Sequence, residues 1–109
     1  MNSGCKVLWT EVAKKDLGDT IEFIAFENPA HAMKILKKIR QKAAKLVTCP
    51  ERGRIVPELH AQGIFIYREL VVYPWRLIYR IADSSVYVLS LLDGRRNVED
   101  ILLHRLISQ

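Results

Sequence analysis

The segment 67–96 repeatedly places arginine among aromatic and aliphatic residues: Arg68, Arg76, Arg80, Arg95 and Arg96. Arginine suits phosphate or carboxylate because its planar guanidinium offers a fork of donors and stays charged at physiological pH. Hydrophobic strands do not need arginine in order to fold. The pattern therefore predicts an anionic partner for this segment.

Arg76 is the strongest single candidate for binding such a partner. The alternative is a structural salt bridge with a sheet neighbour such as Glu69, and the sequence leaves both interpretations open. Arg80 is expected on the same side of its strand, where it either contributes to binding, reaches solvent or pairs with Asp83.

Arg95 and Arg96 follow Gly94 at the point where the last strand gives way to the last helix. Glycine allows a sharp change of backbone direction, and two adjacent guanidinium groups form a localised positive site. Either arginine could instead pair with Glu99 or Asp100.

Glu58 is the acidic residue best placed to act as a general base, since it precedes the strands that carry the arginines. A solvated loop glutamate is the alternative. The histidines show no metal-ligand spacing, and no nucleophile motif or glycine-rich phosphate loop is found, so neither a metal nor another cofactor is expected.

Cys5 and Cys49 lack a CxxC spacing and are expected as incidental thiols in a reducing cytoplasm.

The length of 109 residues is enough for one domain with one modest core, expected over residues 1–109. The net charge of +5 is compatible with nucleic acid or an acidic protein as partner. The longest apolar runs are far too short to cross a membrane, and the first residues lack the pattern of an export signal. A cytoplasmic protein without a membrane partner is expected.

Two helices are predicted after a short strand at 6–9. Thr10 is a plausible N-cap, and Ala13, Leu17, Ile21 and Ile24 give the first helix one apolar stripe. Asn28 followed by proline is a strong start signal for the second helix, so the two should form a tight hairpin. The second helix is rich in lysine, which indicates either a phosphate-tracking surface or an ordinary solvated face.

Three strands are predicted at 64–72, 75–81 and 86–92, joined by short hairpin connections, and Asn97 should cap a short C-terminal helix. The order indicates an α+β fold in which the helix hairpin covers one face of a twisted antiparallel sheet and leaves the other face partly open. Strand alternation directs Leu77 and Tyr79 toward the helices and Arg76 and Arg80 toward the open face. Tyr79 is thus only a weak candidate for chemistry.

The chain resembles the RelE/ParE superfamily of toxins from bacterial type II toxin-antitoxin, or plasmid stabilisation, modules. The match spans nearly the whole chain. It rests on the stripe of the first helix, the Asn28-Pro29 junction, and the segments GRIVPEL (53–59), YREL (67–70), WRLIYRI (75–81) and LDGRR (92–96). The resemblance implies the fold expected above and a cognate antitoxin that wraps the toxin.

Two activities occur in this superfamily. RelE-like members cleave messenger RNA in the ribosome, whereas ParE-like members inhibit DNA gyrase. Arg76 matches a catalytic or phosphate-binding arginine of the ribonuclease branch, and Glu58 matches the carboxylate that some members use. Several ribonucleases carry histidine and tyrosine, or a lone tyrosine, as acid or base where this chain has Gly94 and Arg95. Arginine is a poor proton donor or acceptor at neutral pH.

Three hypotheses follow from the resemblance. The favoured one is growth arrest by ParE-like inhibition of gyrase. The first alternative is a metal-independent, ribosome-dependent endoribonuclease that uses Arg76 and Glu58. The second is an inactive relic whose arginines bind only an antitoxin. In each case Arg68, Arg76, Arg80, Arg95 and Arg96 are the expected residues for binding the target or the antitoxin.

Overall fold

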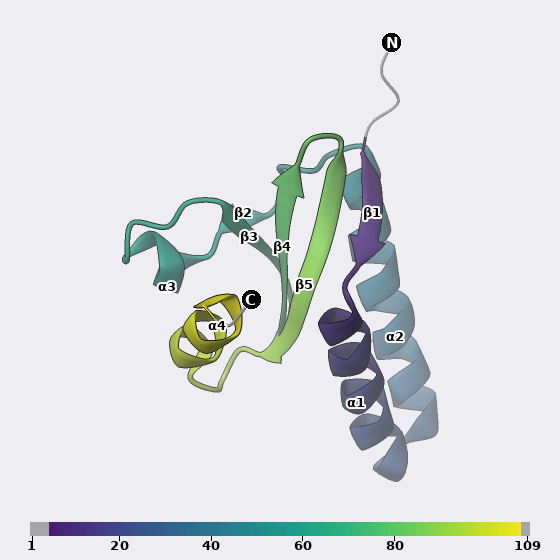
Figure 1. Ribbon diagram of the computed structural model, residues 1–109. Coiled ribbons are helices and arrows are strands. Elements are labelled where there is room, and N and C mark those ends of the chain that lie inside the picture. Colours follow the sequence, from purple (N-terminus) through teal and green to yellow (C-terminus); the bar gives the residue numbers. More distant parts are fainter. Residues whose placement is uncertain (1–4, 108–109) are drawn as a thin grey trace.

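The computed structural model describes residues 5–107, which form a five-stranded sheet with helices on both faces (Figure 1). The strand order is β1-β5-β4-β3-β2. The strands are β1 (Lys6–Trp9), β2 (Arg54–Ile55), β3 (Tyr67–Val72), β4 (Trp75–Ala82) and β5 (Ser85–Asp93). The helices are α1 (Glu11–Glu27), α2 (Pro29–Ala44), α3 (Pro57–His60) and α4 (Val98–Ile107), and a 3₁₀ turn, η1 (Lys45–Val47), follows α2.

Strands β2 to β5 pair antiparallel, but β1 pairs parallel with β5. The predicted α+β fold is confirmed, with the sheet mixed at this edge instead of wholly antiparallel. Strands joined by tight turns must run antiparallel, whereas β1 meets β5 only after a long excursion of the chain, so no turn fixes its direction.

The predicted helix starts are confirmed by their side-chain caps. The Thr10 hydroxyl accepts from the Ala13 amide at 3.2 Å, and the Asn28 side chain accepts from the His31 amide at 3.0 Å. Asn97 likewise accepts from the amide of the third residue after it, at 3.2 Å. Each cap satisfies a backbone donor that the first turn of a helix leaves without a partner.

One face of the sheet is covered by the α1–α2 hairpin, as expected. The buried core beneath the hairpin includes Leu77 and Tyr79 of β4, which confirms the predicted alternation along that strand. Arg68 pairs directly with Tyr79 in the antiparallel register, and directly paired residues share a face. Arg68 therefore lies on the hairpin side of the sheet, opposite Arg76.

The other face was expected to be partly open, and this expectation is wrong for much of its area. Helix α4 lies across it and α3 stands beside α4 (Figure 1). Ile78 of β4 is buried there together with Leu59 of α3 and Leu102 of α4. The α3 helix and the short strand β2 were not predicted. Both are too short to show the repeating pattern of apolar residues from which a helix or strand is predicted.

No helix within residues 5–107 combines the length and apolar character needed to cross a membrane.

Candidate functional site

Arg76 lies at the centre of a buried polar cluster on the sheet face that α3 and α4 cover. Its side chain is only 9% exposed. Both terminal nitrogens donate to the Glu58 carboxylate, Nη1 to Oε2 at 2.7 Å and Nη2 to Oε1 at 2.6 Å, and Nε donates to Oε1 of Glu69 at 2.7 Å. The two strongest catalytic candidates are thus brought together, and they hold each other.

Glu69 is the second carboxylate of the cluster, and its side chain is fully buried. Its Oε2 accepts from Nε of Arg54 at 2.6 Å, while Arg54 itself remains largely exposed. The chain of contacts runs Arg54, Glu69, Arg76, Glu58, with equal numbers of positive and negative charges. Such pairing is what allows ionised side chains to be buried. The structural salt bridge between Arg76 and Glu69 is therefore present.

The cluster sets the protonation of its members. Hydrogen bonds from Arg76 lower the pKa of the Glu58 carboxyl, and its partial burial opposes the shift. The same bonds, joined by those to Glu69, raise the pKa of Arg76 above its ordinary value. Glu58 is consequently a weaker base than a free glutamate, and Arg76 stays charged.

The end of β5 approaches this cluster closely at Gly94. A Cβ atom there would stand 2.7 Å from Cδ of Arg76 and 3.0 Å from the Pro74 carbonyl oxygen. The Gly94 amide donates to that same carbonyl at 2.7 Å. The position needs glycine because the strand end presses against the arginine stem, which leaves no room there for a side chain that could act as acid or base.

Arg95 pairs with Asp93, not with Glu99 or Asp100 as the sequence suggested. Its Nε and Nη2 donate to the Asp93 carboxylate at 3.0 and 2.7 Å, and its amide donates there as well. These bonds lower the pKa of Asp93 to about 2. Arg96 is exposed, and its charge also lowers that pKa.

The remaining arginines do not join Arg76 in one site. Arg68 donates to the carbonyl oxygens of Gly53 at 2.7 Å and Glu51 at 3.3 Å, on the opposite face of the sheet. Arg80 is exposed and forms no ion pair with any of the residues 5–107. It lies near one end of β4, whereas Arg95 and Arg96 follow β5 beyond the other end, because Trp75 pairs with Asp93.

Tyr79 has a structural role. It is fully buried, and its hydroxyl donates to the Pro50 carbonyl at 2.7 Å and accepts from the Gly53 amide at 2.9 Å. Burial raises the pKa of its phenol. These bonds fix the loop that precedes β2.

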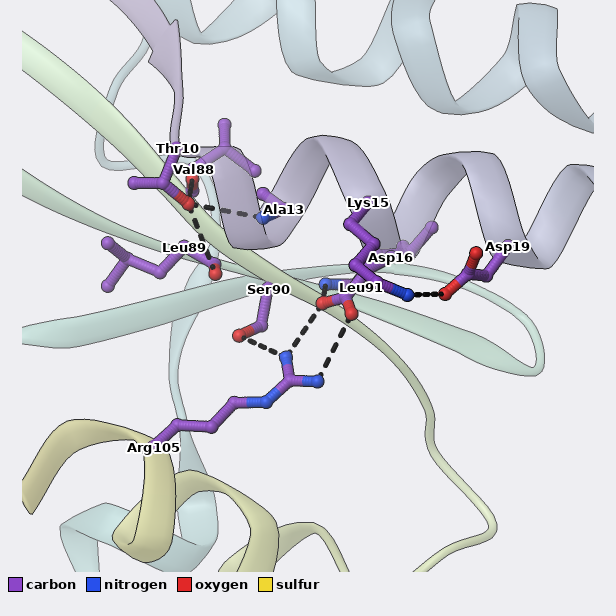
Figure 2. Close-up of polar contacts among 10 residues, drawn as sticks. All are labelled: Thr10, Ala13, Lys15, Asp16, Asp19, Val88, Leu89, Ser90, Leu91 and Arg105. Atoms are coloured by element: carbon purple, nitrogen blue, oxygen red, sulfur yellow. Dashed lines mark hydrogen bonds and ion pairs between the residues drawn. The ribbon is translucent and has the colours of Figure 1, made fainter. Parts of the chain in front are cut away.

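A second polar cluster ties α4 to α1 and β5 (Figure 2). Arg105 donates from Nη1 to Asp16 Oδ2 at 2.7 Å, from Nη2 to Oδ1 at 3.1 Å, and from Nη1 to the Ser90 hydroxyl at 2.9 Å. Asp16 also accepts from the Leu91 amide at 3.0 Å. Neither Asp16 nor Arg105 was singled out in the sequence, where they stand 89 positions apart.

An apolar groove of about 750 Å³ runs between β1 and the helix hairpin. Its lining is mostly hydrophobic and includes Leu8, Trp9, Leu17, Ile21 and Leu36. Strand β1 is an edge of the sheet, so part of its backbone is available for pairing beside the groove. Nowhere in the described range 5–107 do three or more His, Cys, Asp or Glu side chains gather in a way that could hold a metal ion.

Comparison with known proteins defines the class. Residues 7–98 match the family described as "ParE toxin of type II toxin-antitoxin system, parDE". The chain is also 30% identical over 92 residues to Toxin RelE2 of Caulobacter vibrioides, covering 84% of this chain and 97% of the relative. The chain belongs to the ParE toxin family within the RelE/ParE superfamily, and it is the toxin of a type II toxin-antitoxin system. The resemblance expected from the sequence is confirmed.

Two solved structures share the fold. The chromosomal ParDE toxin-antitoxin system of P. aeruginosa superposes with a TM-score of 0.64 at 18% identity, covering 83% of this chain and 96% of the other. The toxin-antitoxin complex RelBE2 of Mycobacterium tuberculosis gives a TM-score of 0.58 at 22% identity, with 85% and 94% covered.

Proposed function

We propose that this toxin arrests growth in the cytoplasm by binding DNA gyrase and does not cleave RNA. The observation that carries the proposal is the engagement of Arg76. A phosphate approaching Arg76 would have to displace Glu58 from both terminal nitrogens, and Glu69 would still hold Nε. An arginine neutralised in this way offers little stabilisation to a phosphate transition state.

The proton-transfer half of a ribonuclease mechanism is equally poorly supported. A general base works best when its pKa lies near the operating pH, whereas Arg76 lowers the pKa of Glu58. Gly94 and Arg95 occupy the strand end that in a ribonuclease would supply the second proton-transfer group. A toxin that acts by binding needs neither group.

Exposed arginines are the proposed contacts to the target. Arg96 and Arg80 present their guanidinium groups to solvent, at opposite ends of β4. Arg95 is exposed too, but Asp93 neutralises it. Arg96 is therefore the better candidate at its end of the sheet, and Arg68, held by backbone carbonyls, is a weaker one.

Two assays on the purified toxin test the target. Supercoiling by purified gyrase should be inhibited, and toeprinting of translating ribosomes should show no toxin-dependent cuts. A-site cuts that disappear in Arg76→Ala, together with normal supercoiling, would establish the ribonuclease alternative instead. If expression of the toxin alone leaves growth unchanged, the inactive relic becomes the better account.

We further propose a cognate antitoxin as partner, bound along the apolar groove beside β1. An extended segment could add to the free edge of β1 while its apolar side chains fill the groove, which is a common mode of peptide recognition. Leu8, at 43% exposed, is a suitable probe because its change need not disturb the core. Leu8→Asp should weaken neutralisation by the antitoxin and leave growth arrest intact.

Ile66→Asp is a matched control for this test, since Ile66 is 54% exposed and does not line the groove. The two variants introduce the same charge at comparably exposed apolar positions. Equal loss of antitoxin binding in both would refute the groove as the site.

A further inference from the structure

Helix α2 carries positive charge that neither the fold nor the proposed target contacts use. Its sequence contains Lys34, Lys37, Lys38, Arg40 and Lys42 and no aspartate or glutamate, and Lys45 follows directly in η1. All six side chains are exposed. The exposed surface of the helix is therefore mostly basic, and its one large exposed apolar residue is Met33, at 62%.

The neighbouring helix α1 shows how exposed lysines are usually accommodated. Lys14 pairs with Glu11 at 3.3 Å, and Lys15 pairs with Asp19 at 2.8 Å. None of the ion pairs formed by residues 5–107 includes a cation of α2. Like charges three or four residues apart destabilise a helix, and of the cations of α2 only Lys42, in the last turn, gains stabilisation from the helix dipole in return.

Four of these cations line up along one side of α2 and are called here the lysine stripe: Lys34, Lys38, Lys42 and Lys45. Their spacing of four, four and three residues keeps them on one side of a helix with 3.6 residues per turn. The stripe extends over about 16 Å along the axis at 1.5 Å per residue. It is thus a linear array of charge and not a single point.

The stripe ends at a small pocket of about 40 Å³ where Lys42 and Lys45 meet Arg52. Leu70 completes the lining, so this pocket contains three cations and no carboxylate. The exposed Glu51 directly precedes Arg52 in the chain. It supplies one negative charge, whereas the four lysines and Arg52 supply five positive charges. The local charge remains strongly positive.

We propose that the lysine stripe and Arg52 bind the phosphodiester backbone of nucleic acid. A row of point charges matches a regularly charged polyanion, and such contacts supply affinity without reading sequence. Gln41 and Ala44 stand beside the lysines and offer no apolar anchor of the kind that protein interfaces use, and the exposed Met33 does not share the helical spacing of the stripe. The surface therefore favours nucleic acid over an acidic peptide.

This inference goes beyond the proposed function and does not depend on gyrase being the target. It concerns the outer side of α2, whereas Arg76, Arg80 and Arg96 belong to β4 and the turn after β5. It can be tested with the toxin and nucleic acid alone.

The test compares two double variants of the full-length toxin that lose the same charge. Lys38→Gln with Lys42→Gln removes half of the stripe, and Lys14→Gln with Lys15→Gln removes two cations from α1. Glutamine preserves helix propensity in both. Binding to labelled duplex DNA and to an RNA hairpin is measured by fluorescence anisotropy at several salt concentrations.

The unmodified toxin should bind with an affinity that falls steeply with salt. The stripe variant should lose affinity on the order of tenfold, and its salt slope should fall by about two, one for each lost phosphate contact. The α1 variant should bind like the unmodified toxin, and Lys38→Arg with Lys42→Arg should keep the affinity. Comparing the affinity for duplex DNA with the affinity for the RNA hairpin then identifies which nucleic acid the stripe binds more tightly.

Three results would overturn the proposal. The first is an absence of binding to both nucleic acids at low salt, and the second is an equal loss in the α1 variant. The third is capture of a polyglutamate peptide through the stripe without nucleic-acid binding, which would reassign the surface to an acidic protein. Circular dichroism of each variant supplies the check that helix content is unchanged.

Discussion

Replacement of Glu69 by glutamine tests whether the Arg76 cluster stabilises the fold as its geometry implies. The carboxylate is fully buried, and it accepts from Arg76 at 2.7 Å and from Arg54 at 2.6 Å. Glutamine preserves the shape but removes the charge. Its amide group also points two hydrogen-bond donors at guanidinium groups that are donors themselves.

The structure sets the size of the expected effect. Removing one partner of a buried ion pair costs about 3–5 kcal/mol. Arg76 keeps both of its bonds to Glu58 in Glu69→Gln. The loss in the free energy of unfolding should therefore lie near the lower end of this range, at about 3 kcal/mol. For a domain of this size, with about 4 °C per kcal/mol, the melting temperature should drop by about 12 °C.

Urea and thermal unfolding at neutral pH measure this effect, with Arg54→Gln as the matched control. The Arg54 side chain is 61% exposed, and Glu69 keeps its hydrogen bond from Arg76 when the Arg54 guanidinium is removed. The control should therefore cost less than about 1 kcal/mol. If Glu69→Gln is no more destabilising than Arg54→Gln, the reasoning that assigns the cluster a structural role is refuted.

Three more perturbations test other contacts. Asp93→Asn should remove a small acid-sensitive contribution: the folded pKa of about 2 lies below the unfolded value, so this stability is present above about pH 4 and is lost as pH falls through 2. Its size stays under about 1 kcal/mol because Arg95 is exposed, and acid titrations that coincide for both proteins would contradict it. Gly94→Ala should cost about 2 kcal/mol in urea unfolding, since the new Cβ meets an Arg76 stem that carboxylates hold in place; an unchanged midpoint would show that the stem can move. Arg105→Ala should cost about 2 kcal/mol by leaving a partly buried carboxylate without its bidentate partner, and faster hydrogen exchange should be confined mainly to α4; protection unchanged in α4 would argue against this tie.

Local signals made much of the fold predictable. Thr10, Asn28 and Asn97 are capping residues whose preference depends on the adjacent backbone alone, and each begins a helix as predicted. The alternation along β4 likewise assigned Tyr79 to the core and Arg76 to the opposite face. These signals act over a few residues, so the sequence displays them directly.

The polar partners were harder to predict because they depend on elements far apart in the chain. Glu69 was named as a possible partner of Arg76, but the bidentate bond to Glu58 requires the short helix α3, which has no detectable periodicity. Asp16 and Arg105 meet only after the whole sheet has formed. The exposed Arg95 pairs with Asp93, on the other side of Gly94. Sequence spacing alone does not decide between this carboxylate and those of Glu99 and Asp100.

The parallel pairing of β1 with β5 has a consequence for the order in which the nascent toxin acquires its shape. The Thr10 hydroxyl that caps α1 also donates to the Val88 carbonyl, 78 positions later, and among residues 5–107 the strand beside β1 is β5 alone. The pairing of β1 with β5 and the Thr10 contact at the start of α1 therefore cannot form until Ser85–Asp93 have left the ribosome. Contacts of such long sequence separation form slowly. A shortened chain that lacks β5 should thus leave β1 unpaired and should not arrest growth, because the edge of the sheet forms only after residues 85–93 have been translated.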